Sequence, residues 1–284
     1  MFIIVGFAIV LVCTIGGFMI AGGNPVTLIH LSEIVVIFGI ALGVFVCCAP
    51  KATLVATIRA ITHALKADGP SKSEIEDLMK MLYEIFLVGR RNGLIALDEH
   101  VGDPQSSSIF SKYPSFLNHE DRVEFLTSNM RPLIDGKVKP DQLKSLMNED
   151  IHTKEHEGHR PVDVVHTLAD SLPGIGICAA VLGIIVTMSV LDQGASAVGA
   201  KVSAALTGSF MGVWVAYGFL TPLSSRLHAI HANEIVYFQV LAKALTGFAN
   251  GLAPAMAIEI ARRAIGSDER PSADDLEAML KEMK

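Results

Sequence analysis

The chain has 284 residues, of which 51% are hydrophobic, and its mean hydropathy is +0.45. A soluble domain of this length is much less apolar on average, so the composition indicates that part of the surface faces lipid. The formal net charge is -6, and no overall basic field predicts binding to nucleic acid. The four cysteines lie in apolar runs without metal-ligand spacing, and the sequence predicts no cofactor.

Four segments are mostly apolar over about 20 residues, the length that a helix needs to cross a bilayer. They comprise residues 2–21, 28–48, 172–191 and 202–223. A Gly-Gly-Asn-Pro turn separates the first pair, and a short polar loop separates the second pair. The first segment lacks a preceding basic stretch and a cleavage site, so we expect it to be retained as a helix. The sequence therefore predicts an all-α integral membrane protein with four transmembrane helices in two hairpins and a helical cytoplasmic domain.

The basic residues are distributed unevenly along the chain. Of 23 Lys and Arg residues, 15 lie between residues 50 and 164, 7 follow residue 223, and only Lys201 lies elsewhere. Because basic residues concentrate on the cytoplasmic side, we expect a multi-pass protein of the bacterial inner membrane with both termini and the large loop in the cytoplasm. The predicted parts are residues 1–49 with transmembrane helices 1 and 2, 50–164 as the cytoplasmic helical domain, 165–227 with transmembrane helices 3 and 4, and 228–284 as the cytoplasmic tail.

The polar regions carry clear helix signals. Capping motifs predict that helices begin after Ser71 and Ser272, and Gly93 is expected to end the first of these. Further helices are predicted to begin near Asn118 and at Pro140, since proline is tolerated in a first helical turn. The cytoplasmic regions are therefore expected to be helical, with little strand.

Ionisable side chains are scarce in the predicted membrane segments. Glu33 lies near the periplasmic end of the second segment, and Asp170 lies at the cytoplasmic edge of the third. Each is either a functional group or an interfacial residue that anchors a helix end. Neither lies in mid-membrane, so a carboxylate that carries ions across the bilayer is expected to come from another chain.

The third and fourth segments combine small residues, prolines and hydroxyls. Small residues spaced four apart allow helix backbones to approach closely, and they are Gly176, Ala179, Ala180, Gly183, Gly208, Gly212 and Ala216. Pro173 and Pro222 each remove one helix hydrogen bond, which creates a possible kink or hinge. Thr207 and Ser209 either line an aqueous path or bond to carbonyls of their own helix.

One histidine cluster has the spacing of metal ligands on a helix. His152, His156 and His159 share a helical face, and three imidazoles can bind zinc. The sequence offers neither a second cluster nor an acid at the required place. We therefore favour a solvated helix face and predict no metal site.

Two stretches resemble a known family. Residues 169–176, ADSLPGIG, and 179–183, AAVLG, resemble the third-helix signature of the MotA/PomA family of stator subunits. Residues 208–212, GSFMG, with 216–219, AYGF, and Pro222 resemble its fourth helix. The two-hairpin layout, the cytoplasmic insertion and Glu33 also match, so the resemblance covers nearly the whole chain.

The resemblance implies a subunit of the flagellar motor and not an enzyme. Copies of the chain, expected to form a pentameric ring, would surround a pair of B-type (MotB-like) subunits, each with one helix that bears an essential aspartate. Proton passage at that aspartate would rotate the ring, and the cytoplasmic domain would push the rotor protein FliG during swimming and chemotaxis.

The same resemblance assigns roles to individual residues. Arg90 matches the rotor-facing arginine of the family, and Asp98, followed by Glu99, stands where the family usually has glutamate. Pro173 and Pro222 match the prolines that couple conduction to movement. Two positions bear on which ion is conducted. Ala180 stands where sodium-type relatives place threonine, and Ser209 stands where the family usually has threonine in its fourth helix. The resemblance therefore implies protons and not sodium, since a methyl group cannot replace a hydration shell.

Two other classes of protein compete with this interpretation. An ExbB/TolQ-like energising subunit of a proton-driven envelope transport complex would share the ring but typically has three membrane helices. Four predicted spans and the region from Arg90 to Asp98 argue against it. A membrane enzyme is disfavoured because the sequence shows no nucleophile–base pair or phosphate-binding loop.

Overall fold

The structure is a computed structural model that describes residues 2–66 and 69–283. Within these ranges every regular element is a helix, as predicted. The chain divides into two compact units, one made of residues 1–68 and 157–230 and the other of residues 69–156 and 231–284. Helices α8 (Pro140–Met188) and α10 (Thr221–Ala249) contribute residues to both units, and each unit has its own apolar core.

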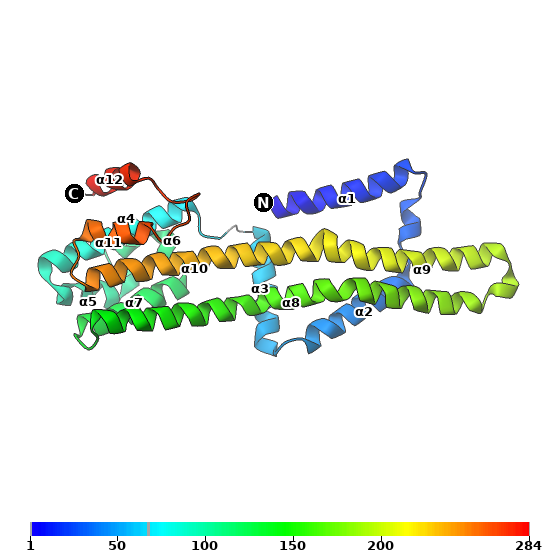
Figure 1. Cartoon of the computed structure of the whole chain (residues 1–284), viewed down its shortest axis with the longest axis horizontal. Helices are drawn as coiled ribbons and strands as arrows, with labels where there is room; N and C mark the ends of the chain where they lie inside the picture. Colours follow the sequence, from blue (N-terminus) through cyan, green and yellow to red (C-terminus); the bar gives the residue numbers. More distant parts are fainter. Residues whose placement is uncertain (1, 67–68, 284) are drawn as a thin grey trace. The chain divides into compact units, whose positions relative to one another are not determined.

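The first unit is built on two helical stretches that lie side by side. The C-terminal part of α8 runs beside α9 (Ala195–Val215), a π-helical segment η6 (Ala216–Leu220) and the start of α10 (Figure 1). Helix α2 (Leu31–Cys47) packs Ile37 and Ala41 against this pair. These helices therefore bring the predicted second, third and fourth membrane segments together.

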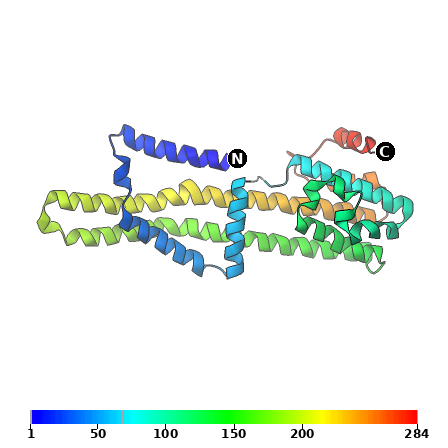
Figure 2. The same ribbon diagram turned by 180° about the vertical axis from the view of Figure 1, so that it is seen from behind.

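Two further helices complete the first unit. Helix α3 (Lys51–Lys66) crosses α8 and α10 in both views, with Ala64 buried in the apolar cluster that holds them (Figure 2). Helix α1 (Phe2–Ile20) is attached through an aromatic contact to Phe219 and a hydrogen bond of 2.9 Å from Trp214 Nε1 to Thr14 Oγ1. The short 3₁₀ turns η1 (Pro25–Leu28) and η5 (Leu191–Gln193) lie in the two connections between predicted spans.

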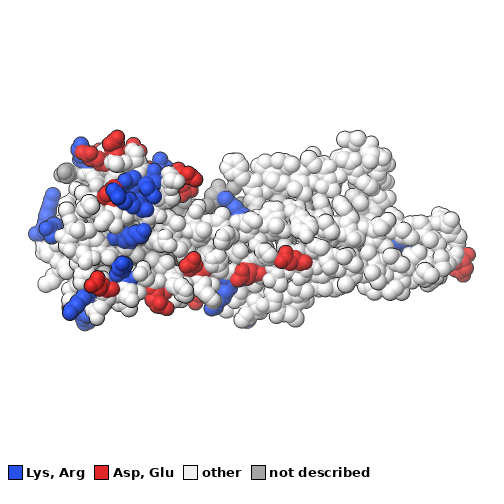
Figure 3. All heavy atoms as spheres, viewed as in Figure 1, with Lys and Arg blue, Asp and Glu red and all other residues white. Residues whose placement is uncertain are grey.

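A large part of the surface of the first unit is apolar, as expected of a membrane protein. Among the residues that the structure describes, three stretches are long and apolar enough to cross a membrane, namely Phe2–Ile20, Pro140–Met188 and Ala195–Ala249, and α2 is a shorter apolar helix of 17 residues. No residue of α1 is buried, and Ile20 is 91% exposed. Figure 3 shows few charged side chains over α1 and α9. Such helices are stable where lipid or another chain covers them.

Small residues hold α8 close to α9, as the sequence predicts. A Cβ atom placed on Gly212 would lie 2.6 Å from the Leu172 carbonyl oxygen and 2.7 Å from the Gly176 Cα atom. A Cβ atom on Gly183 would lie 2.7 Å from the Ala205 Cβ atom. Because these neighbours are backbone atoms or short side chains, the contact requires residues without larger side chains.

The helix that begins at Pro140 and the third predicted membrane segment form one helix. We expected a cytoplasmic helix from Pro140 and a membrane helix from about Leu172, whereas α8 runs for 49 residues through both. Pro161 and Pro173 lie inside it. Each proline removes one backbone hydrogen bond, and the adjacent turns keep theirs, so neither proline ends the helix.

The second unit packs short helices around the ends of α8 and α10. Its core includes a stacked pair, Phe86 and Phe248, with ring centroids 4.4 Å apart. Its helices are α4 (Lys72–Asn92), α5 (Asp98–Gly102), α6 (Pro114–Leu117), α7 (Glu120–Ile134), α11 (Pro254–Arg262) and α12 (Ala273–Lys281), with 3₁₀ turns η2 (Leu94–Leu97), η3 (Pro104–Ser106) and η4 (Phe110–Lys112). Charged side chains gather over these elements (Figure 3).

The predicted helix boundaries in this unit are largely confirmed. The Ser71 hydroxyl accepts a hydrogen bond of 3.2 Å from the Glu74 N–H, and Gly93 ends α4 with a φ of 86°. Ser272 forms a complete capping box at the start of α12. Helix α7 begins at Glu120, two residues after the predicted position. These local signals suffice because caps satisfy backbone groups at a helix end without help from distant residues.

Candidate functional site

Glu33 lies in the first turn of α2 and lines a pocket in the first unit. The pocket has a volume of about 430 Å³ and lies among α2, α8 and α9, where His30, Ser32 and Lys201 are its other polar side chains. Glu33 is only 6% exposed, and it accepts a hydrogen bond of 2.5 Å from the Ser32 hydroxyl. A carboxylate, an imidazole and an ammonium group at one pocket can bind or relay charge. Sequence reasoning used Lys201 only as an orientation signal and missed its place beside Glu33.

Ala180 and Ser209 lie at the contact between α8 and α9. Both are half-buried, and the Ser209 carbonyl oxygen would lie 3.2 Å from a Cβ atom on Gly176. Next to them, the Glu33 Cγ atom would lie 3.3 Å from a Cβ atom on Gly208. The structure therefore brings Glu33 to the same interface as the small-residue motifs.

Thr207 faces a different hollow. Its hydroxyl donates a hydrogen bond of 2.9 Å to the Ser203 carbonyl oxygen, so it bonds to its own helix. Thr207 lines a second pocket of about 420 Å³ with Thr14 of α1 and Phe210. The polar residues of α9 are thus divided between two hollows, a separation that the spacing in sequence did not reveal.

Pro173 and Pro222 occupy different backbone settings. Pro173 lies within continuous α-helix, next to the tight contact of the Leu172 carbonyl group with Gly212. Pro222 follows the π-helical segment η6, where the Thr221 N–H bonds to the Ala216 carbonyl oxygen five residues earlier. Such segments interrupt the α-helical ladder and occur often at functional sites. A break in the regular α-helical hydrogen bonding therefore precedes Pro222, whereas the hinge role of both prolines stays a prediction.

The other predicted polar sites lie on the surface. Asp170 is exposed, and its Oδ2 atom lies 3.0 Å from Nδ1 of His166, one turn earlier. His152 and His156 are exposed, whereas the half-buried His159 ring lies 5.2 Å from the His228 ring. Among the described residues, no group of three or more histidine, cysteine or acidic side chains is arranged to hold a metal ion.

The predicted rotor-facing charges lie around one turn of the second unit. Arg90 is in the last turn of α4, and Asp98 and Glu99 begin α5; all three side chains are exposed. Gly93, with its positive φ, reverses the chain between them. Exposed charges of this kind are available to a partner and contribute little to folding.

A buried arginine in the second unit was missed by the sequence analysis. Arg122 of α7 is 1% exposed, and its guanidinium group pairs with Glu74 of α4 and Glu234 of α10, each at 2.9 Å. The same group lies 4.1 Å from the centre of the Tyr237 ring. Burial alone would lower the pKa of Arg122, but the two carboxylates raise it. Arg122 thus joins three helices and remains charged.

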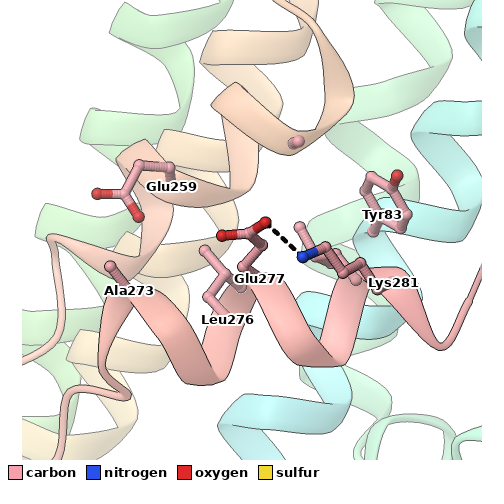
Figure 4. A pocket seen from close by; sticks show the side chains of 8 residues that line it. Tyr83, Glu259, Ala273, Leu276, Glu277 and Lys281 are labelled. Atoms are coloured by element: carbon pink, nitrogen blue, oxygen red, sulfur yellow. Dashed lines mark ion pairs between the residues drawn. The ribbon is translucent and has the colours of Figure 1, made fainter.

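The C-terminal helix forms one wall of a further pocket in the second unit. This pocket of about 260 Å³ lies among Tyr83 of α4, Glu259 of α11 and residues of α12 (Figure 4). Leu276 packs toward it, and the exposed Lys281 pairs with Glu277 at 2.6 Å. The hydrogen bond from Arg262 is the main reason that the pKa of Glu259 falls to about 2.

Two family models match the chain, one in its N-terminal third and one in its middle and later part. Residues 4–93 match the family described as "Motility protein A N-terminal". Residues 118–240 match the "MotA/TolQ/ExbB proton channel family".

Sequence similarity to curated relatives extends over almost the entire chain. Motility protein A of Salmonella typhimurium is 32% identical over 277 residues, which cover 98% of this chain and 94% of the relative. Motility protein A of Escherichia coli is 31% identical over 284 residues, with coverage of 100% and 96%. Chemotaxis protein LafT of Vibrio parahaemolyticus is 30% identical, with coverage of 98% for both proteins.

Solved structures share the fold. "Structure of C. jejuni MotAB" matches with a TM-score of 0.80 and 22% identity, covering 95% of this chain and 98% of the other. "Structure of the flagellar MotAB stator complex from Bacillus subtilis" matches with a TM-score of 0.77 and 19% identity, covering 94% and 97%.

Proposed function

Since the chain belongs to the motility protein A family, we propose that it is the A subunit of a flagellar motor stator, which conducts protons and generates torque on the rotor. The nearly full-length similarity to motility proteins carries this proposal. The family match at residues 118–240 also includes TolQ and ExbB, but the match at residues 4–93 is to motility protein A alone. This favours motility over an ExbB/TolQ-like role in envelope transport.

The proposed complex includes a B-type, MotB-like subunit that supplies the titrating aspartate. The two similar solved structures are both described as MotAB, which supports such a partner. Helices α1, α2 and α9 carry no acidic residue in their central turns, and Glu33 is at one end of α2. One carboxylate near a membrane edge cannot relay protons across about 30 Å of hydrocarbon.

In the proposed layout, four transmembrane helices form two hairpins. Helix α2 would span with 17 residues, about 25 Å of helix, which is at the short end of the usual range. The third and fourth spans would be segments of α8 and of the stretch from α9 into α10. Copies of the chain would form a homo-oligomeric ring, proposed to be a pentamer, around the B-type subunits.

The proposed orientation places both termini and residues 50–164 in the cytoplasm, between the transmembrane parts 1–49 and 165–227, with 228–284 as the tail. Cysteine labelling tests it in a background that lacks the four exposed native cysteines. An impermeant thiol reagent added to whole cells should label Ser196→Cys and leave Ser108→Cys unlabelled. Both serines are exposed, whereas the neighbouring Ser107 is 3% exposed and would resist labelling on either side. Labelling of Ser108→Cys alone would invert the orientation.

The proposed coupling elements are Pro173, Pro222, the contact between α8 and α9 that holds Ala180 and Ser209, and Thr207 in its separate pocket. The π-helical segment before Pro222 supports a hinge at this position, because the backbone hydrogen bonds there already depart from the α-helical pattern. Ala180 offers no hydroxyl at the position where a sodium-type stator would be expected to have one, which supports protons. Protonation of the partner's aspartate would then bias the helices toward a second arrangement.

The proposed rotor contact consists of Arg90, Asp98 and Glu99, and its partner is the rotor protein FliG. The exposure of all three charges supports this role. Arg90→Glu should abolish or strongly reduce swimming at an unchanged membrane level of the protein, since an exposed charge adds little to stability. Normal swimming of cells that carry Arg90→Glu with Asp98→Asn and Glu99→Gln would remove this assignment.

Proton flux into vesicles tests the conduction proposal directly. We expect little flux with this chain alone, substantial flux with its B-type partner, and little again when the partner's aspartate is changed to asparagine. Deletion of the gene should abolish swimming, and the intact gene should restore it. Substantial flux from the chain alone would contradict the proposal that the B-type subunit supplies the titrating aspartate, and Glu33 would become the candidate proton carrier. Swimming that survives the deletion would contradict the motility role.

A further inference from the structure

Ile95 presents an apolar side chain to solvent in the middle of the charged turn. It is 81% exposed, the highest exposure of any large apolar residue among the described residues of the second unit. Leu146 and Met256, which lie elsewhere in that unit, are 50% and 51% exposed. A single exposed apolar residue is ordinary, but one that lies in the chain between the proposed rotor-facing charges matches the composition of an interface anchor with a polar rim.

The turn that carries Ile95 is held by hydrogen bonds and by packing. The Ala96 N–H bonds to the Gly93 carbonyl oxygen at 3.2 Å, and the Asp98 N–H bonds to the Ile95 carbonyl oxygen. Leu97 is fully buried and lies against Gly89, where an added Cβ atom would be 3.0 Å from Leu97 Cδ1. Leu97 therefore fixes the turn to the core, and Ile95 points outward on a rigid base.

Charges of opposite sign precede and follow Ile95 along the chain. Arg90 and Arg91 end α4, and Asp98 and Glu99 begin α5; all four are exposed. Exposed charges steer an encounter and fix its register but add little affinity, whereas burying an isoleucine side chain adds much more. A contact made by these charges alone would be weak and easily screened by salt.

We propose that Ile95 is the apolar anchor of the rotor contact, inserted into a recess on the rotor protein. The recess would be apolar and bordered by an acidic residue that meets Arg90 and a basic residue that meets Asp98. This proposal rests on the rotor contact proposed above and adds the group that supplies most of its affinity. The chain's own charge order thus defines the chemistry of the surface that it meets.

Binding of the purified stator complex to the purified rotor protein tests the anchor. Ile95→Ser should weaken binding about 10- to 100-fold, the loss expected for one buried isoleucine side chain, and Ile95→Leu should retain most of it. Leu146→Ser and Met256→Ser are matched controls and should bind like the unchanged complex. Raising the salt concentration should shrink the effect of Arg90→Glu and leave that of Ile95→Ser intact. Equal binding by Ile95→Ser and Leu146→Ser would overturn the proposal.

Swimming assays of cells that carry these variants distinguish an error in the Ile95 anchor from an error in the rotor contact as a whole. We expect Ile95→Ser to reduce motor torque while membrane level and proton flux with the B-type partner stay normal. If Arg90→Glu stops swimming and Ile95→Ser does not, the anchor is wrong and the rotor contact stands. If neither variant affects swimming, the rotor contact itself is wrong. Disulfide cross-linking of Ile95→Cys to a second copy of this chain, and not to a cysteine on the rotor protein, would likewise overturn the anchor.

Discussion

Gly212→Ala should weaken the contact between α8 and α9. The new methyl group would lie 2.6 Å from the Leu172 carbonyl oxygen and 2.7 Å from the Gly176 Cα atom, and neither backbone atom can rotate away. Carbon atoms pack best at about 3.5–4.0 Å, so the two helices would have to separate by about 1 Å. Overpacking of this kind costs about 1–3 kcal/mol, and the better helix propensity of alanine offsets up to about 1 kcal/mol of it.

Thermal unfolding of the purified protein in detergent measures this effect. A net loss of about 1–2 kcal/mol corresponds to a Tm lower by roughly 2–8 °C for a chain of this size class. Gly199→Ala is the matched control, since Gly199 also lies in α9 and nothing would lie within 4 Å of its Cβ atom. Its Tm should stay the same or rise. Equal Tm values for the two variants would refute the close-packing argument.

Three further predictions concern the second unit. Arg122→Leu should lower the free energy of unfolding by about 3 kcal/mol. This is near the low end for a broken buried ion pair, because both glutamates keep some exposure. A loss below about 1 kcal/mol, measured by thermal unfolding, would contradict this. The pKa of Glu259 is about 2 in the folded chain and ordinarily 4.5, so its contact with Arg262 stabilises above about pH 4.5 and is lost as the pH falls toward 2. The Tm difference between the unchanged protein and Glu259→Gln should therefore vanish at low pH, and a constant difference would be the contrary result. Ser272→Ala should cost about 1 kcal/mol by removing the cap of α12, seen as faster hydrogen exchange confined to residues 273–281.

The sequence alone specified the features that depend on neighbouring residues. Apolar length indicated the membrane segments, and the structure contains apolar helices at each of them, although in the described part of the chain three stretches meet the full length for a span and α2 is shorter. The caps at Ser71 and Ser272 act within one turn and were found where predicted. The family was also recognisable, because its motifs around Pro173 and Pro222 are contiguous in the chain.

The functional residues could be predicted from the sequence only in part. Exposure of Arg90, Asp98 and Glu99 agrees with the idea of a charged contact surface, but their roles remain predictions. The pocket shared by Glu33 and Lys201 joins residues from α2 and α9, and no spacing in the sequence places them together. The π-helical segment before Pro222 likewise appears only when the helix is followed bond by bond.

The tertiary structure decided which residues of one type are buried and which are displayed. Arg122 reads as one more basic residue of a solvated region, yet its partners lie 48 residues earlier and 112 residues later in the chain. Ile95 and Leu97 are both apolar residues of the same turn, yet Leu97 is buried and Ile95 is 81% exposed. Hydrogen-bonded caps and apolar length are local and can be read from the chain, whereas burial depends on which distant segments the fold brings into contact.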